Sequence, residues 1–307
     1  MADIAIEAEG LIKRYGRGTD AKTALTGLDL TVNQGEVFGF LGPNGAGKST
    51  TIRLIVDLIR PTGGRLRVLG ADPRAAVAAR ARIGYLPGDF IVDGRQTPRE
   101  LLTYLGALRG GVPSARIEAL ADRFDLDLSR RIGALSKGNR QKVGLVQAFM
   151  HHPDLLVLDE PTSGLDPFLQ HQFVDLVREA SADGQTVFMS SHVMSEVQQT
   201  CHRAGIIREG ALVTVTDIDE LRARAQRKIT IMLAGPVDPQ EFSVLPELHD
   251  VNVAETAGGG SILHATLSGS PNGLLKAAAR HDVTDLLAEE PELEELFFSV
   301  YDQGLTT

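Results

Sequence analysis

Several residue types and patterns are scarce in this sequence of 307 residues. It has no tryptophan, one cysteine and no long apolar run. The single thiol, Cys201, cannot form a disulfide within the chain, and we expect it to be a small buried hydrophobic residue rather than a reactive centre. The longest apolar runs, at residues 37–41 and 155–158, have the length of strands and fall far short of the ~20 residues that a membrane span needs. We therefore expect a soluble chain without a disulfide framework.

Positive charge is scarce as well. The sequence has 31 Lys and Arg against 40 Asp and Glu, which gives a formal net charge of −9. A nucleic-acid face is usually a basic stripe, so no nucleic-acid partner is predicted. The first residues show no basic stretch followed by an apolar one, so we expect no secretory signal and a cytoplasmic location. Any contact with a membrane is then expected to run through a protein partner.

The most informative pattern that is present is a glycine-rich loop between a strand-like stretch at 36–41 and a helical stretch at 50–59. Its glycines let successive backbone N–H groups face one anion, and the following helix adds its positive end. Lys48 is expected to reach the β- and γ-phosphates, and the Ser49 hydroxyl suits a Mg²⁺ ion that bridges them. The predicted nucleotide-binding residues here are Gly42, Asn44, Gly45, Gly47, Lys48, Ser49 and Thr50.

A pair of carboxylates, Asp159 and Glu160, follows the apolar run at 155–158. Such a run is typical of a buried parallel strand, and α/β sheets bind ligands at the carboxyl ends of these strands. Asp159 can hold Mg²⁺ through water opposite Ser49, and Glu160 can take a proton from an attacking water. The alternative is a strand that ends in two solvated acids, but the phosphate-binding loop upstream favours the catalytic pair.

Between these motifs, residues 135–141 read Leu-Ser-Lys-Gly-Asn-Arg-Gln. This segment resembles the signature motif of ABC-transporter ATPases, residues 163–166 resemble their D-loop with Asp166, and residues 190–192 resemble their switch-histidine segment. The resemblance implies an α/β P-loop fold that binds and hydrolyses ATP. It also implies that Ser136 and Gly138 face the γ-phosphate of an ATP bound by a second copy. The expected assembly is a head-to-tail dimer with two ATP molecules at the interface.

The same resemblance gives expected roles to two further residues. His192 is expected to contact the γ-phosphate and to hold the attacking water in line; the alternative is an ordinary core or edge histidine. Tyr15 lies where the family has an aromatic side chain that stacks on adenine, and the alternative is simple packing at a strand end.

Three positions depart from the family pattern. Gly88 stands where the family usually has a glutamine that touches the metal and signals to the membrane partner, and the neighbouring Asp89 could supply the missing oxygen through water. Lys137 and Asn139 replace the common Gly and Gln of the signature. These changes resemble a branch of ATPases that serve bacterial exporters of the daunorubicin-resistance kind. The resemblance implies a separate multi-helix membrane permease as partner, with this chain peripheral on the inner face of the cell membrane.

The motifs and segment lengths of the chain also bear on other possible functions. A regulatory or mechanical ABC ATPase without a permease stays open as the alternative function. The stretch from 89 to 135 is too short for a coiled-coil arm, which argues against chromosome-organising and DNA-repair relatives. A single P-loop argues against the tandem translation factors, and an unrelated P-loop kinase would have no use for the segment at Ser136.

Two domains are predicted. The ATPase domain is expected at 1–224, with a helical subdomain at about 89–150 in which Thr97 to Glu100 start a helix. Residues 225–307 are expected to form a small α+β accessory domain of order βαββαβ, a ferredoxin-like unit that regulates or dimerises rather than catalyses. Its last helix, after Pro291, would align an apolar stripe on one face: Leu293, Leu296, Phe297 and Val300. We do not expect the pair His151 and His152 to bind metal, because no third ligand lies at helical spacing.

Overall fold

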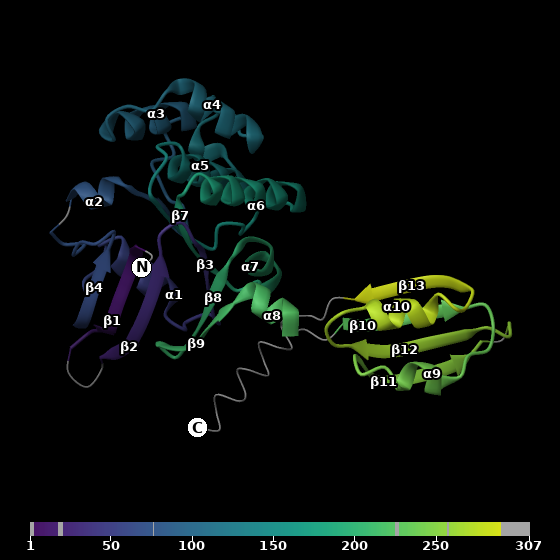
Figure 1. Ribbon diagram of the computed structural model, residues 1–307. Helices are drawn as coiled ribbons and strands as arrows, with labels where there is room; N and C mark the ends of the chain where they lie inside the picture. The colour runs from purple at the N-terminus through teal and green to yellow at the C-terminus, as the bar shows by residue number, and fades with distance from the viewer. Residues whose placement is uncertain (1–2, 18–20, 76, 225–226, 257, 290–307) are drawn as a thin grey trace. The chain divides into compact units, whose positions relative to one another are not determined.

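The computed structural model describes residues 3–17, 21–75, 77–224, 227–256 and 258–289. The chain divides into two compact units, Met1–Asp217 and Ile218–Thr307, drawn in Figure 1. The division lies before helix α8 (Ile218–Arg224), whereas the sequence placed the boundary after that helix. The apolar stripe predicted beyond Pro291 lies outside the described residues. Within the described residues, no helix is long and apolar enough to cross a membrane.

A six-stranded sheet forms the centre of the first unit. Its strand order is β5-β6-β7-β3-β8-β9, with the strands from β5 to β8 parallel and β9 antiparallel to β8. The strands are β3 (Val37–Leu41), β5 (Ile83–Leu86), β6 (Leu155–Asp159), β7 (Thr186–Ser191), β8 (Arg203–Arg208) and β9 (Ala211–Asp217). Every residue of β3, β6 and β7 is buried, as expected for parallel strands that are covered on both faces.

A second, antiparallel sheet has the order β2-β1-β4. Its strands are β1 (Ile4–Tyr15), β2 (Lys22–Asn33) and β4 (Gly63–Val68). Helix α1 (Lys48–Ile55) contacts both sheets, and its buried residues Ile52 and Ile55 belong to one apolar core with Phe38, Phe188 and Leu11. The rings of Phe38 and Phe188 stack with their centroids 5.9 Å apart. This core fixes the start of α1 at the end of β3. A short helix, α2 (Val77–Ala81), precedes β5.

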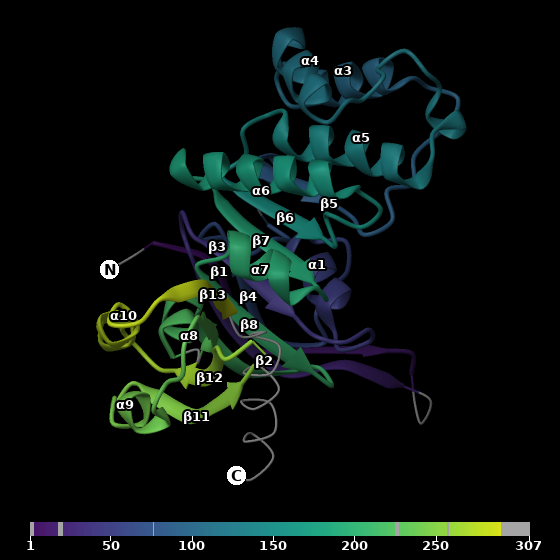
Figure 2. The same ribbon diagram turned by 90° about the vertical axis from the view of Figure 1, so that its right-hand side faces the viewer.

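Helices α3 (Pro98–Leu108), α4 (Ser114–Arg123) and α5 (Lys137–Phe149) gather at one end of the first unit, as Figures 1 and 2 show. The predicted helix start at Thr97 is confirmed, because Thr97 and Glu100 exchange two hydrogen bonds in a capping box. The side chain of Arg116 on α4 donates to the carbonyl of Met150 at 2.9 Å and so ties α4 to the end of α5. Helices α6 (Pro167–Ala182) and α7 (Met194–Thr200) contact β7.

The second unit continues from α8 as a four-stranded antiparallel sheet with the order β11-β12-β10-β13. The side chains of Phe242 and Leu274, one from each helix, pack with Ile231 and Leu263 in its apolar core. The helices and strands occur in the predicted order: β10 (Arg227–Leu233), α9 (Pro239–Ser243), β11 (Leu248–Glu255), β12 (Ser261–Leu267), α10 (Asn272–Ala278) and β13 (Val283–Glu289).

Candidate active site

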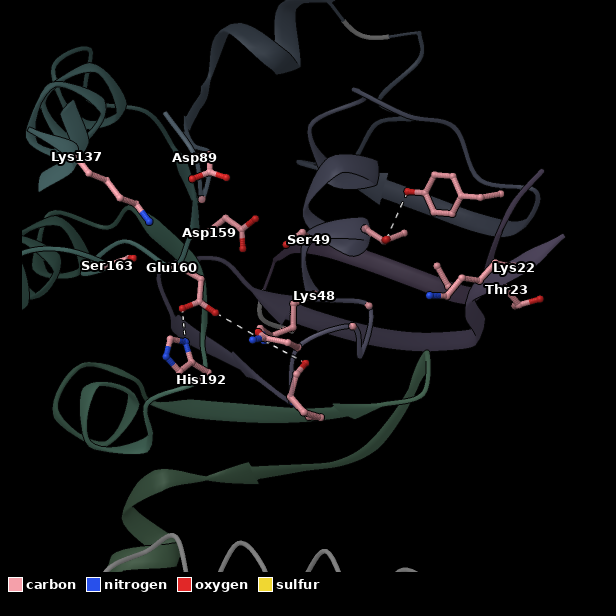
Figure 3. A pocket seen from close by; sticks show the side chains of 18 residues that line it. Lys22, Thr23, Lys48, Ser49, Asp89, Lys137, Asp159, Glu160, Ser163 and His192 are labelled. Carbon is pink, nitrogen blue, oxygen red and sulfur yellow. Dashed lines mark hydrogen bonds and ion pairs between the residues drawn. The ribbon is translucent and has the colours of Figure 1, made fainter. Parts of the chain in front are cut away.

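A cavity of about 650 Å³ opens at the carboxyl ends of β3, β6 and β7, shown in Figure 3. Small-molecule sites usually have volumes of roughly 300–1,000 Å³, so this cavity has the size of a ligand site. It brings together side chains from segments that are far apart in the sequence. The predicted residues that line it are Tyr15, Asn44, Gly45, Gly47, Lys48, Ser49, Thr50, Asp159, Glu160 and His192.

The glycine-rich loop joins β3 to α1 along one wall of this cavity. Gly47 has φ 118, and a Cβ atom there would lie 2.9 Å from the Ala24 carbonyl oxygen, so only glycine fits. Helix α1 then begins at Lys48 and has no carboxylate in its first turn. Its N-terminal end therefore presents uncompensated positive charge to the cavity, which suits a phosphate group.

Lys48 is buried at the floor of the cavity, with 6% of the side chain exposed. Its Nζ donates to the Gly42 carbonyl at 2.6 Å and lies 3.7 Å from Glu160 Oε1. A buried ammonium group needs such partners, because desolvating an unpaired charge is costly. Gly42 thus holds Lys48 but does not itself line the cavity.

The two carboxylates at the end of β6 are held differently. Asp159 is buried, and its Oδ1 accepts a hydrogen bond from the Ser190 hydroxyl at 2.6 Å. Glu160 has φ 51, a left-handed conformation that is uncommon outside glycine and concentrates at functional sites. Gln141 of α5 donates to the carbonyl oxygens of Glu160 and Pro161, each at 3.3 Å. These contacts hold the strained peptide in place.

This backbone conformation directs the Glu160 side chain to two cationic or polar partners. One carboxylate oxygen faces Lys48, and the other forms a hydrogen bond with His192 Nδ1, as Figure 3 shows. His192 is 59% exposed and opens to the cavity. A carboxylate in contact with an exposed imidazole can accept and pass on a proton, so the geometry suits general-base chemistry.

Tyr15 lies at the end of β1 and lines the same cavity as His192. Its ring is 38% exposed, and its hydroxyl lies 3.4 Å from Thr50 Oγ1. The Lys13 Nζ atom lies 5.1 Å from the ring centroid. The exposed ring at the cavity wall can stack on a planar base.

Besides Gly42, three of the predicted residues do not line this cavity: Ser136, Gly138 and Asp166. Ser136 caps α5 by accepting a hydrogen bond from the Asn139 N–H at 3.2 Å, and Asp166 caps α6 by accepting one from Leu169. At Gly138, a Cβ atom would lie 2.4 Å from the Gly164 carbonyl oxygen, so the signature segment and the D-loop segment touch through their backbones.

The cavity also includes residues to which the sequence analysis assigned no role. These are Lys22, Thr23 and Ala24 of β2, together with Ser163 and Lys137. The signal for the first three is strand pairing: β1 and β2 form an antiparallel pair in which Tyr15 lies opposite Lys22. A prediction of that pairing would have placed residues 22–24 beside Tyr15.

The oxygen atoms at the cavity floor fit a magnesium ion that is bound together with a nucleotide. Ser49 supplies a hydroxyl and Asp159 a carboxylate whose Oδ2 is not engaged by Ser190. Both are the hard oxygen ligands that Mg²⁺ prefers. Within the described parts of the chain, no group of three His, Cys, Asp or Glu residues could hold a metal ion.

Two titratable side chains with shifted pKa values lie away from the cavity: Cys201 is buried and His151 is partly buried. Burial raises the pKa of Cys201 to about 12, and the predicted small buried hydrophobic residue is confirmed. Burial and the nearby Arg109 charge lower the pKa of His151 to about 4. The Arg109 guanidinium lies 2.7 Å from His151 Nε2 and also donates to the Ile83 carbonyl. His152 lies 3.6 Å from Asp183, so the two histidines have different partners.

The comparisons with known proteins agree with this geometry. Residues 25–163 match the family model described as ABC transporter. A daunorubicin resistance ATP-binding protein of Streptomyces coeruleorubidus is 40% identical over 232 residues, which are 73% of this chain and 71% of that protein. A bacitracin transport ATP-binding protein of Bacillus licheniformis is 31% identical over 309 residues, 97% of this chain and 98% of that protein.

A solved dimeric ATP-binding cassette, in a post-hydrolysis state bound to ADP and Pi, has the same fold. Its TM-score is 0.62 at 21% identity, and the match covers 69% of this chain and 98% of that one. The chain therefore belongs to the ABC-transporter ATPase family. Within that family it is a transporter ATP-binding subunit, an ATPase homologous to drug and antibiotic exporter ATPases.

Proposed function

We propose that this chain powers a bacterial exporter by closing a head-to-tail dimer of two copies around ATP and reopening it on hydrolysis. The observation that carries the proposal is the position of the signature segment. Ser136 and Gly138 do not line the chain's own cavity, whereas the P-loop, Asp159 and Glu160 do. One chain thus supplies part of an ATP site, and Ser136 and Gly138 form a second phosphate-binding segment outside it, although Lys137 between them lines the cavity.

That second segment has the properties of an anion site. Helix α5 starts at the exposed cap Ser136 and has no carboxylate in its first turn. Its unpaired N–H groups and positive end suit the γ-phosphate of an ATP bound by another copy. The dimeric arrangement of the solved cassette supports the same assembly.

We assign the chemistry of one site to five side chains. Lys48 holds the β- and γ-phosphates, and Ser49 with Asp159 holds Mg²⁺. When bound, the ion would neutralise charge that develops on phosphoryl transfer. Glu160 takes the proton of the attacking water, and His192 orients that carboxylate and the water.

We assign the adenine base to the part of the cavity that Tyr15 lines. The ring of Tyr15 is exposed there, and stacking on a base contributes roughly 1–3 kcal/mol without a need for base-specific hydrogen bonds.

The coupling partner in this proposal is a separate multi-helix membrane permease, which would hold the chain at the inner face of the cell membrane. Large apolar side chains stand exposed on and near the helical group: Ile91 is 86% exposed, Tyr104 58% and Leu108 66%. Exposed apolar side chains of this size suit a protein interface. The drug-resistance and bacitracin-transport names of the relatives support export as the direction.

We assign the second unit to the ferredoxin-like class and give it a regulatory or dimerising role. Its order βαββαβ and its strand order β11-β12-β10-β13 support the class. The bacitracin-transport relative aligns over 97% of this chain, so the match extends through this unit.

Mixing two inactive variants tests the shared site. One chain carries Ser136→Glu, which places a negative charge where the partner's phosphate would bind, and the other carries Lys48→Ala. A mixed dimer then contains one site with Lys48 from the first chain and Ser136 from the second. We expect the mixture to recover phosphate release that neither variant has alone.

The control is each variant mixed with a tagged copy of itself, which should stay inactive. Pull-down through the tag establishes that mixed dimers form. Mixed dimers without activity would contradict the shared site. The alternative, a regulatory ABC ATPase without a permease, predicts that affinity purification from membranes yields no multi-helix membrane protein.

A further inference from the structure

The loop that follows β5 has room for a Cβ atom at Gly88, in contact with Asp159. A Cβ atom built on Gly88 would lie 3.4 Å from Asp159 Oδ2 and 3.5 Å from its Cγ, which is ordinary van der Waals contact. Gly88 is not among the residues with positive φ, so its backbone conformation does not require glycine. The space therefore admits a side chain that this chain does not have.

The next residue, Asp89, brings a carboxylate to the same place. It is exposed, and it lines the cavity together with Asp159 and Ser49. Figure 3 shows its side chain beside that of Asp159, on the side towards Lys137. Within the described residues, Asp89 has no hydrogen bond or ion pair that would explain its position.

Asp93, four residues further on, provides an internal comparison. It is also exposed, but its carboxylate binds the Arg95 guanidinium through Nε at 3.1 Å and Nη2 at 2.7 Å. The hydrogen bonds from Arg95 lower the pKa of Asp93 to about 2. One acid of this loop thus has a cationic partner, whereas the described residues form no ion pair with Asp89 beside the nucleotide cavity.

We propose that Asp89 holds the nucleotide-bound Mg²⁺ through one of the ion's water ligands, in the space that Gly88 leaves open. The proposal rests on the proposed function, because it requires ATP and Mg²⁺ in this cavity. Mg²⁺ dehydrates reluctantly and usually keeps several waters, so a nearby carboxylate can bind it without direct coordination. Without the ion, Asp89 and Asp159 are like charges that face one cavity, and a divalent cation relieves their repulsion.

The test measures how much Mg²⁺ strengthens ATP binding, in a Glu160→Gln background so that ATP stays intact. The affinity of a fluorescent ATP analogue is measured in excess EDTA and again with excess Mg²⁺. Loss of an outer partner of a metal typically weakens metal binding by about 10- to 100-fold. We expect Asp89→Asn to reduce the Mg²⁺-dependent gain in affinity by at least about 10-fold and to leave the affinity in EDTA unchanged.

Two further variants sharpen this result. Asp93→Asn is the matched control and should keep the full Mg²⁺-dependent gain. Adding Gly88→Gln to Asp89→Asn places an amide oxygen in the open space and should restore most of the gain. A gain within twofold of the parent in Asp89→Asn would overturn the proposal, as would a loss that Gly88→Gln does not restore. If the parent binds no nucleotide in EDTA or Mg²⁺, the proposed function itself fails, which is a different outcome.

Discussion

A glutamate–histidine pair occurs in each of the two units, and the two pairs look alike in isolation. Glu160 contacts His192 in the first unit, and Glu241 contacts His281 at 2.8 Å in the second. The glutamate side chains are 23% and 27% exposed. The glutamate exposures alone do not single out either pair as the more reactive one, although His192 is 59% exposed and His281 24%.

Their surroundings differ. The other oxygen of Glu160 faces the buried Lys48, its backbone is left-handed, and it opens to a cavity that holds further buried polar groups. Glu241 lies on the short helix α9, and its second partner is the exposed Arg280. A carboxylate–imidazole contact is therefore not a catalytic site by itself. Its reactivity depends on the charges, strain and solvent around it.

The same contrast holds for what each unit buries. Within the described residues of the second unit, Ser261 is the only buried polar side chain. The first unit buries Glu36, Lys48, Lys142 and Asp159, besides several polar residues. Burial of a charge is unfavourable unless partners compensate it. The buried charged side chains, with their unfavourable burial, lie in the unit that binds ATP.

Exchange of the two glutamates for glutamine is the strongest test of the comparison. We expect Glu160→Gln to lower ATP turnover by about 10²- to 10⁴-fold, because loss of a general base has effects of this size. ATP binding should remain. Glu241→Gln is the matched control and should leave turnover within about twofold. Phosphate release under saturating ATP measures both, and a Glu160→Gln rate within threefold of the parent would contradict the assignment.

Loss of the largest core side chain of the second unit tests whether the two units are independent. Phe242 is fully buried there, and Phe→Ala changes in cores typically cost about 3–5 kcal/mol. We expect Phe242→Ala to unfold the second unit at lower urea and to leave ATP affinity unchanged.

The single cysteine makes this measurement selective. Cys201 is buried in the first unit and its raised pKa keeps it a thiol, so it should react with a thiol reagent only when that unit opens. Its reaction rate in Phe242→Ala should equal that of the parent. A faster reaction would show that the first unit depends on the second.

Two lysines provide a smaller contrast, measured as affinity. Lys48→Ala removes the cation expected on the β- and γ-phosphates, and a hydrogen bond to a charged group contributes about 1.5–3 kcal/mol. We expect ATP affinity to fall by about 10- to 100-fold. Lys276, an exposed lysine on α10 in the second unit, is the control, and Lys276→Ala should bind ATP as the parent does.

The smallest expected effect is a pH dependence of the first unit's stability. The pKa of His151 is lowered to about 4 in the folded chain, against 6.5 for an ordinary histidine. As the pH falls from about 6.5 towards 4, the unfolded chain binds this proton first, so the folded state loses stability over that window. The loss at pH 5 should be about 1 kcal/mol, allowing for partial exposure. Urea unfolding of His151→Gln at pH 7 and 5 should show a smaller difference than the parent, and an equal difference would contradict this.

Some features of the molecule can be predicted from the sequence alone, and others cannot. The P-loop and the strand that ends in Asp159 are local patterns, because a turn and a period of apolar residues fix them. The order of strands and helices in the second unit followed from the same kind of local signal. Thr97 and Glu100, which are three positions apart, specified the start of a helix.

Features that depend on distant contacts were not predictable in this way. Lys22 reaches the cavity only through the pairing of β1 with β2, and the left-handed Glu160 peptide depends on Gln141 from another helix. The boundary at Asp217 was missed because α8 reads as a terminal helix of the ATPase, whereas its contacts group it with the second unit. No local pattern in the sequence shows to which of the two units α8 belongs.

The contact between Lys48 and Glu160 has a consequence for the order of events in a cycle. At 3.7 Å, the carboxylate occupies the vicinity of the ammonium group that is expected to receive the phosphates. If a γ-phosphate binds Lys48 as proposed, it competes with Glu160 for that ammonium group, so nucleotide binding would release the proposed base. In this arrangement the Glu160 carboxylate would stay paired with Lys48 until the nucleotide is bound. Lys48→Met would remove the ammonium group, and the Glu160 carboxylate should then be held by His192 alone.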